Sequence, residues 1–275
     1  MRKINYPLIV SDFDGTLVND DGTISERNKK AISEYVAAGG AFAISTGRLP
    51  AGILSRAKEL GLQGKVCCCQ GAIILDIESN EVIMEGRLSL ESTIKACKKM
   101  EELGLHIHAY DLWDFYANKD DEPLKMYEML VKTKATKVLD KPLSQFLEEN
   151  KLRAYKLLAM VEPENNEKIF RILDEEKFDG CEVTKSAAFL VEVINSQYSK
   201  GTAVAFLADY YGVPLDKVIA VGDQINDTPM IERAGLGIAV KNAETALKEK
   251  ADYVCEYTNE EGAIAEIIEK FGFCQ

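Results

Sequence analysis

Short apolar stretches alternate with amphipathic stretches in the first and the last third of this chain. The apolar stretches are short, and the segments between them carry helical periodicity. Near the N-terminus we expect strands over 7–13, 41–46, 65–76 and 81–87, and helices over 25–40 and 49–62. Near the C-terminus we expect strands over 217–223, 236–240 and 252–257, and helices over 199–212, 227–235, 242–251 and 260–271. This alternation predicts an α/β fold with a parallel sheet and helices on both of its faces.

The middle of the chain has a different pattern. Two helical segments, 89–104 and 163–178, accompany shorter strands that we expect to pair in antiparallel fashion, over 105–111, 113–118, 152–161, 181–186 and 188–194. We therefore predict a discontinuous Rossmann-like core, residues 1–86 and 195–275, with an α+β cap domain, residues 87–194, inserted into it. His106 and His108 are expected on one face of a cap strand, where sheet packing is favoured over a metal pair.

Composition limits the classes of function. The chain of 275 residues is 47% hydrophobic, so it can bury a large core, and its net charge of −12 argues against non-specific nucleic-acid binding. No stretch approaches the roughly 20 apolar residues of a membrane span, and the N-terminus has no pattern of a signal peptide. The seven cysteines have neither zinc-site nor disulfide-framework spacing, so we expect reduced thiols and a cytoplasmic protein.

The first expected strand ends on two carboxylates, Asp12 and Asp14, followed by Gly15. In an extended chain, residues i and i+2 face the same way, so the two carboxylates point into one space. Their repulsion there needs a cation or a proton to relieve it. The alternative is ordinary Asp-Gly turn chemistry.

Three further polar clusters follow expected strands or begin expected helices. Each also has an ordinary structural explanation, as a helix cap or as a solvent-exposed lysine. The clusters are Ser45-Thr46-Gly47 with Arg48, then Lys200, and then Gly222-Asp223 with Asn226 and Asp227. Together they supply carboxylate oxygens, hydroxyls, an amide and a lysine at the carboxyl edge of one sheet. Mg²⁺ prefers oxygen ligands of this kind, and the set as a whole indicates a magnesium-dependent phosphoryl-transfer site.

In this order, "DFDGTL", "STGR", "SKG" and "GDQIND" resemble the four motifs of the haloacid dehalogenase-like (HAD) hydrolases. The resemblance is strongest to the Cof-type sugar-phosphatase branch, and it extends to "QGAIILD" and "GIAVKNAETALKEKADYV". It implies a Rossmann-like core with a cap between the second and third motifs. This sequence departs from the branch at Gln70, where Asn is usual, and at Lys241, where Gly is common. Both departures bear on specificity more than on activity.

The resemblance assigns roles to individual residues. Asp12 matches the nucleophile that forms an aspartyl-phosphate, and Asp14 matches the general acid and base. The positions that match phosphate contacts are Phe13, Thr46, Gly47, Lys200 and Asn226. The positions that match the magnesium site are Asp12, the backbone carbonyl of Asp14, and Asp223, with Asp227 as the supporting acid.

These observations predict an Mg²⁺-dependent phosphatase that hydrolyses small phosphate monoesters, with sugar phosphates as the favoured class. Its partner would be a small phosphorylated metabolite, with neither nucleic acid nor membrane involved. Two alternatives remain. A phosphomutase or phosphotransferase of the same superfamily would return the phosphoryl group to a sugar hydroxyl, and a non-catalytic protein would only bind a phosphometabolite.

Overall fold

The computed structural model describes residues 2–131 and 134–274, and these form two compact units. Of the described residues, 2–46, 56–84 and 199–274 form the first unit, and 47–55, 85–131 and 134–198 form the second. The segment 47–55 thus groups with the inserted part of the chain, although it follows the second strand directly. The domain limits stated above stay a prediction.

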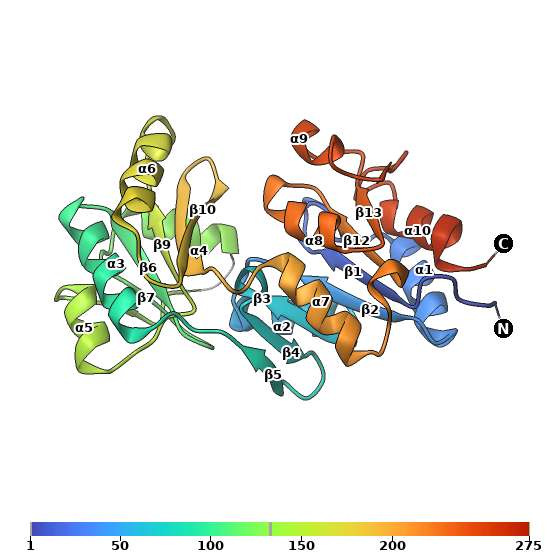
Figure 1. Cartoon of the computed structure of the whole chain (residues 1–275), viewed down its shortest axis with the longest axis horizontal. Coiled ribbons are helices and arrows are strands. Elements are labelled where there is room, and N and C mark those ends of the chain that lie inside the picture. The colour runs from blue at the N-terminus through green and yellow to red at the C-terminus, as the bar shows by residue number, and fades with distance from the viewer. Residues whose placement is uncertain (1, 132–133, 275) are drawn as a thin grey trace. The chain divides into compact units, whose positions relative to one another are not determined.

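The first unit is built on an eight-stranded sheet in the order β14-β13-β12-β1-β2-β3-β4-β5 (Figure 1). The six strands from β14 to β3 run parallel, and β4 pairs with β3 in the antiparallel direction. The α/β fold class with a parallel-sheet core is therefore confirmed. The strands are β1 (Leu8–Asp12), β2 (Ala41–Ser45), β3 (Lys65–Cys68), β4 (Ile73–Asp76), β5 (Val82–Glu85), β12 (Val218–Gly222), β13 (Leu236–Ala239) and β14 (Tyr253–Val254).

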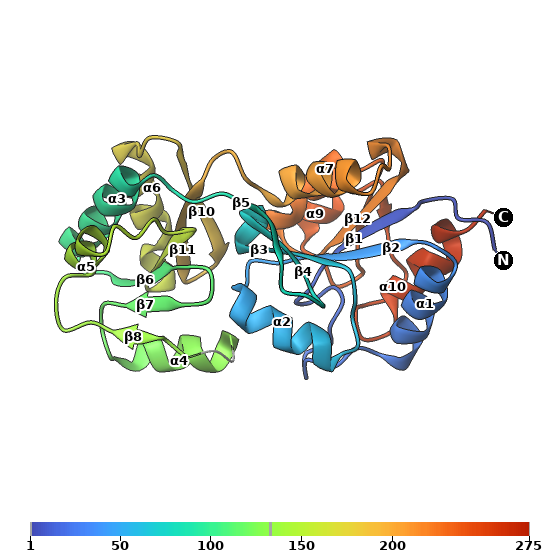
Figure 2. The same ribbon diagram turned by 90° about the horizontal axis from the view of Figure 1, so that it is seen from below.

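Helices cover both faces of this sheet. In Figure 2, α7 lies on one side of the β12, β1 and β2 strands, and α1 and α10 lie on the other. Ser25 is the N-cap of α1, as its position predicts, and its hydroxyl accepts a hydrogen bond from the backbone N–H of Asn28. The helices are α1 (Glu26–Ala37), α7 (Lys200–Tyr210), α8 (Thr228–Arg233), α9 (Thr245–Lys248) and α10 (Ala263–Ile267), while α2 (Pro50–Glu59) begins in the segment that groups with the second unit.

The second unit has a six-stranded sheet in the order β10-β11-β9-β6-β7-β8, antiparallel except for the β7–β8 pair. Three elements, α4, α5 and β8, were not expected from the sequence. The strands are β6 (His106–Tyr110), β7 (Phe115–Ala117), β8 (Lys137–Val138), β9 (Lys156–Met160), β10 (Cys181–Ala187) and β11 (Leu190–Asn195), and the helices are α3 (Leu90–Glu102), α4 (Glu122–Val131), α5 (Leu143–Glu149) and α6 (Asn166–Glu176).

Strand alternation divides the second sheet into an apolar face and a mixed face. Side chains such as Ile107, Leu157 and Val193 join those of α3, α5 and α6 in one buried cluster. In Figure 1 these three helices lie on one side of the sheet and α4 lies on the other. The alternate positions, among them His108 and Lys156, face away from the cluster, because successive strand residues point to opposite faces.

Among the residues that the structure describes, no helix combines the length and the apolar character needed to cross a membrane.

Candidate active site

The polar clusters meet because the strands that carry them are neighbours in the first sheet. β1 lies between β2 and β12, and Asp12 pairs in register with Ser45. The whole of β1 and β12 is buried, and both strands end at the same edge because they run parallel. Asp12 is the last residue of β1, and Asp223 directly follows β12. Two strands that are distant in the sequence therefore bring the carboxylates of Asp12 and Asp223 close together at one edge of the sheet.

Lys200 is the cation of this site. It is the first residue of α7, and only 2% of its side chain is exposed. Its Nζ lies 2.5 Å from Asp12 Oδ1 and 2.5 Å from Asp227 Oδ1. Burial alone would lower the pKa of this amine, but the attraction of the two carboxylates outweighs burial and raises the pKa. Lys200 thus remains an ammonium group at neutral pH.

Three buried carboxylates lie close together at this site, and two of them contact that ammonium group. Asp12, Asp223 and Asp227 each offer an oxygen within 4.8 Å of the others. Burial is the main cause that raises the pKa of Asp12 well above its ordinary value, and burial with the neighbouring Asp227 raises the pKa of Asp223 to about 6. One lysine does not balance three carboxylates, so the cluster favours a further cation. Hard oxygen donors in this number fit Mg²⁺.

Asp227 supports the cluster through the backbone. Its Oδ2 accepts hydrogen bonds from the N–H groups of Asp223, at 2.9 Å, and Gln224, at 3.1 Å, while its Oδ1 contacts Lys200. Both carboxylate oxygens of Asp227 therefore already have partners within the protein. This arrangement fixes the turn that follows β12 and so orients the Asp223 side chain.

Two glycines leave room for these carboxylates. A Cβ atom on Gly15 would lie 2.6 Å from Asp223 Oδ2, and Gly15 has φ +76°, a conformation that L side chains rarely adopt. A Cβ atom on Gly222 would lie 2.4 Å from the Cβ of Asp227. Larger residues at either position would push a carboxylate out of the cluster.

Thr16 is a site residue that the sequence reasoning missed. It is fully buried, and its Oγ1 donates a 2.8 Å hydrogen bond to Asp223 Oδ1. This bond fixes the carboxylate that follows β12 to the turn that follows β1. Thr16 belongs to the "DFDGTL" motif, so the sequence did mark it as a candidate. Its hydrogen bond to a residue of another motif cannot be predicted from either motif alone.

Three of the remaining predicted residues, Phe13, Asp14 and Thr46, directly follow β1 or β2 at the same edge of the first sheet. Asp14 is exposed, whereas Phe13 is 2% exposed. Thr46 is 2% exposed, and its backbone N–H donates to Cys67 O at 2.8 Å. Gly47 follows Thr46 but groups with the second unit, where its carbonyl accepts from Lys156.

Asn226 lies next to Gln70, the position at which this chain departs from the family pattern. Asn226 Nδ2 is 3.5 Å from Gln70 Oε1. Gln70 is in a turn with φ +59°, between Cys69 at +49° and Gly71 at +97°. The turn brings Gly71 so close to Ser199 that a Cβ atom there would lie 2.2 Å from the Ser199 carbonyl oxygen. The turn thus sits against the residue that precedes Lys200.

Comparisons with known proteins identify the family. Residues 9–268 match the family described as haloacid dehalogenase-like hydrolase. A Bacillus subtilis protein, "5-amino-6-(5-phospho-D-ribitylamino)uracil phosphatase YcsE", is 30% identical over 269 residues, which cover 97% of this chain and 96% of the relative. Protein TM0651 of Thermotoga maritima shares the structure with a TM-score of 0.84 at 28% identity, covering 98% of each chain. A Bacteroides thetaiotaomicron haloacid dehalogenase-like hydrolase gives a TM-score of 0.84 at 29% identity, covering 96% of this chain and 99% of that one. The chain therefore belongs to the haloacid dehalogenase-like hydrolases, as its motifs predict.

Proposed function

We propose that the protein is a magnesium-dependent phosphatase, which hydrolyses small phosphate monoesters through a phosphoryl group carried on Asp12. The observation that carries this proposal is the placement of Asp12. It is a buried carboxylate at the end of a central strand, in contact with a buried lysine, and a second, exposed aspartate lies two residues further along. Few structural roles require this combination, whereas phosphoryl transfer uses every part of it.

In the first step, a carboxylate oxygen of Asp12 attacks the phosphorus atom, and the bond from phosphorus to the ester oxygen breaks. Asp14 gives its proton to the departing alkoxide, which leaves as an alcohol. Lys200 lowers the energy of the negative charge that gathers on the transferred group, because its ammonium is already fixed beside Asp12. The backbone near Thr46 and the amide of Asn226 supply further contacts to the phosphoryl oxygens.

In the second step, water hydrolyses the acyl phosphate. Asp14, now ionised, takes a proton from the attacking water, and phosphate leaves as Asp12 regains its carboxylate. Asp14 thereby regains the proton that it gave to the alkoxide, and its exposed position suits this role because the attacking water can reach it.

Mg²⁺ would be held by Asp12, Asp223 and the carbonyl of Asp14, and it would supply charge neutralisation between the carboxylates and the phosphate. The proposed substrates, phosphorylated sugars and related polyols, fit the name of the B. subtilis relative, whose stated substrate carries a phosphate on a ribityl chain. All seven cysteines are free thiols, which supports the proposed cytoplasmic location.

The proposal is tested by phosphate release from a panel of phosphate esters in the presence of Mg²⁺. We expect Asp12→Asn to abolish release while the circular dichroism spectrum is retained, and EDTA to silence the native enzyme until Mg²⁺ is added back. Asp209→Asn, an exposed change on α7, is the matched control and should retain full activity. Phosphate release by the Asp12→Asn variant, or release that persists in EDTA, would overturn the proposal.

The same assay separates the alternatives. A phosphomutase would convert one phosphorylated sugar into another without accumulating phosphate, and a binding protein would do neither. Chromatography of the organic product distinguishes these outcomes.

A further inference from the structure

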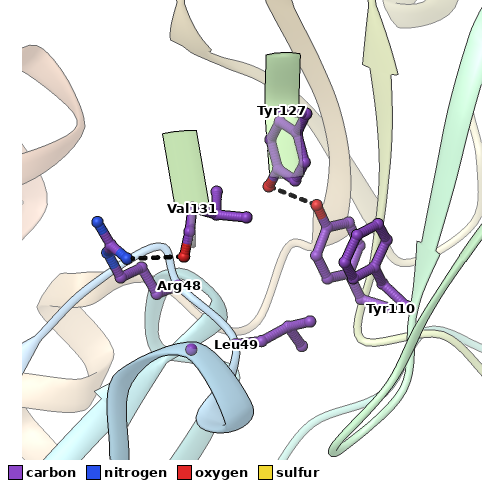
Figure 3. A pocket seen from close by; sticks show the side chains of 7 residues that line it. Arg48, Leu49, Tyr110, Tyr127 and Val131 are labelled. Atoms are coloured by element: carbon purple, nitrogen blue, oxygen red, sulfur yellow. Dashed lines mark hydrogen bonds between the residues drawn. The ribbon is translucent and has the colours of Figure 1, made fainter. Parts of the chain in front are cut away.

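One side of α4 is held against the second sheet. Leu124 and Tyr127 on this side are buried. The hydroxyl groups of Tyr127 and Tyr110 are hydrogen-bonded, as Figure 3 shows, and the ring of Tyr127 meets that of His108 edge to face, with 4.7 Å between the ring centres. Tyr110 and His108 belong to β6, so these contacts fix the rotation of the helix about its axis. The opposite side of α4 therefore has a fixed orientation towards solvent.

The solvent-facing side of α4 is apolar as well. Met126, Met129 and Leu130, here called the α4 stripe, are 47%, 73% and 54% exposed. Each residue turns an α-helix by about 100°, so these side chains share one face, opposite Leu124 and Tyr127. In Figure 2, α4 forms the outer layer on its side of the second sheet. A helix that is apolar on both sides is normally covered on both, which indicates that another surface packs on the α4 stripe.

An open cavity lies beside the α4 stripe. Its volume is about 850 Å³, and Pro123 and Met126 of α4 line it together with residues such as His106, Met160 and Phe189. All residues that line it belong to the second unit. At interfaces, the side chains that contribute most to binding fill pockets on the partner. The cavity can therefore receive apolar side chains of a molecule that packs on the α4 stripe.

The charges around α4 have a direction along the helix. Asp120, Asp121 and Glu122 lie at its start, and Lys134 and Lys137 follow its end. This order suits the dipole of the helix itself. It also means that two antiparallel copies of α4 would place the acids of each copy beside the lysines of the other.

The region is also nearly neutral in an acidic protein. Residues 120–137 contain four acidic residues and four lysines, whereas the whole chain has a net charge of −12. Electrostatic repulsion between two copies of this chain is therefore weaker around α4 than over the surface as a whole.

We propose that the protein associates with a second copy of itself through the α4 stripe, with the two α4 helices antiparallel across a twofold axis. A twofold interface uses the same patch on both copies, so the patch must complement itself. The spacing of the α4 stripe allows this, because Met126 of one copy lies opposite Leu130 of the other and Met129 lies near the axis. Leu130 of each copy then lies next to the cavity beside Met126 of the other copy.

Other occupants fit the α4 stripe less well. An unrelated protein would need lysines and acids in the reverse order along its surface, an arrangement that a second antiparallel copy already has. Helices that lie on membranes have basic residues flanking their apolar face, whereas α4 begins with three acids.

The association is tested by sedimentation velocity of the full-length protein over a series of concentrations. One pair of ten-residue helices buries less than the roughly 1,200 Å² of stable interfaces, so we expect a reversible dimer whose fraction rises with concentration. Met129→Glu places like charges near the axis and should raise the dissociation constant by about tenfold or more. The control is Val36→Glu, the same kind of change at an exposed residue of α1, and it should leave the dissociation constant unchanged.

An exchange of charges tests the antiparallel arrangement. Lys134→Glu with Lys137→Glu makes both ends of α4 acidic, and Asp120→Lys with Glu122→Lys makes both ends more basic. Asp121 is kept, because its carboxylate accepts a hydrogen bond at the start of the helix. Each double variant alone should dimerise more weakly than the unmodified protein, because like charges then meet. An equimolar mixture of the two should associate again, since each acidic end then meets a basic one, and circular dichroism checks that both are folded.

Three results would overturn the inference. The first is a monomer at every concentration up to about 1 mM, the weak end of the affinity scale. The second is a dimer that Met129→Glu leaves unchanged, and the third is a mixture that associates no better than its two components. Cosedimentation with phosphatidylcholine and phosphatidylglycerol vesicles tests the membrane as an occupant, and a monomeric protein that binds them through Met129 also contradicts the proposal. None of these measurements depends on phosphate release, so the proposed function is tested separately.

Discussion

Replacing Lys200 by Met tests the electrostatics on which the active site depends. The change removes the ammonium group that contacts two of three buried carboxylates. Breaking a buried ion pair on one side typically costs about 3–5 kcal/mol, because the remaining charge stays buried without compensation. For a chain of this size, that corresponds to a fall in Tm of roughly 10 °C.

Magnesium should restore part of this loss. A cation that binds only the folded protein adds about 2.7 kcal/mol of stability at a concentration of 100 Kd. Without Lys200 the site is more negative, so we expect Mg²⁺ to stabilise the Lys200→Met variant more than the unmodified protein. Phosphate release should be lost in both EDTA and Mg²⁺, because Lys200 is also needed for the transferred group.

The assay is urea and thermal unfolding of both proteins, each in EDTA and in Mg²⁺. Lys241→Met is the control, since Lys241 is 54% exposed and its ion pair with Glu261 spans 3.6 Å. Exposed pairs of this kind contribute about 0–1 kcal/mol. The reasoning is refuted if Lys200→Met is as stable as the control variant in EDTA, or if Mg²⁺ stabilises it no more than it stabilises the unmodified protein.

Two further substitutions address the site and its support. The Gly15→Ala variant should bind Mg²⁺ more weakly in calorimetry, because the added Cβ atom would displace Asp223 Oδ2. Gly61→Ala is the control, since Gly61 also has a positive φ, +70°, but has open space around it. The control variant should have similar backbone strain and should bind Mg²⁺ normally. Equal affinities in the two variants would rule out the steric argument. Hydrogen bonds, first of all from Lys65, hold the pKa of Asp76 well below its ordinary value. Asp76→Asn should therefore cost about 1 kcal/mol at pH 7, where the carboxylate is charged in both the folded and the unfolded state. The difference should begin to shrink as the pH falls below about 4, the pKa of Asp in the unfolded chain, and should vanish only when the pH falls through the lowered pKa of Asp76 in the folded protein. A difference that is unchanged between pH 7 and pH 2 contradicts this account.

The first unit was predictable because its signals are local. β1 and β12 are continuous apolar runs, and the helices between strands have clear periodicity and caps, as Ser25 shows. The carboxylates at the strand ends follow from the same pattern, since parallel strands end at a common edge. Individual tertiary contacts could not be predicted from these local signals. An example is the hydrogen bond from Thr16 to Asp223, which joins residues 207 positions apart.

The second unit was predicted less completely, for identifiable reasons. The helix α4 has apolar residues on its solvent-facing side as well as on its buried side, with Met126 47%, Met129 73% and Leu130 54% exposed. The strand β8 has two residues and the helix α5 has seven, both too short for a reliable periodic signal. The turn at Cys69 and Gln70 was hidden within an apolar run, because neither residue ordinarily indicates positive φ.

The pairing of β1 with β12 also affects how this protein is made. On the ribosome, β1 emerges early with both of its edges able to pair, and β2 can occupy only one of them. The other edge of β1 can pair only after β12 has been synthesised, and Asp223, which follows β12, becomes available at the same time. A nascent chain therefore cannot assemble the carboxylate cluster, whatever magnesium concentration it meets. Catalysis therefore requires that the segment carrying β12 has been synthesised, and until then one edge of β1 stays unpaired.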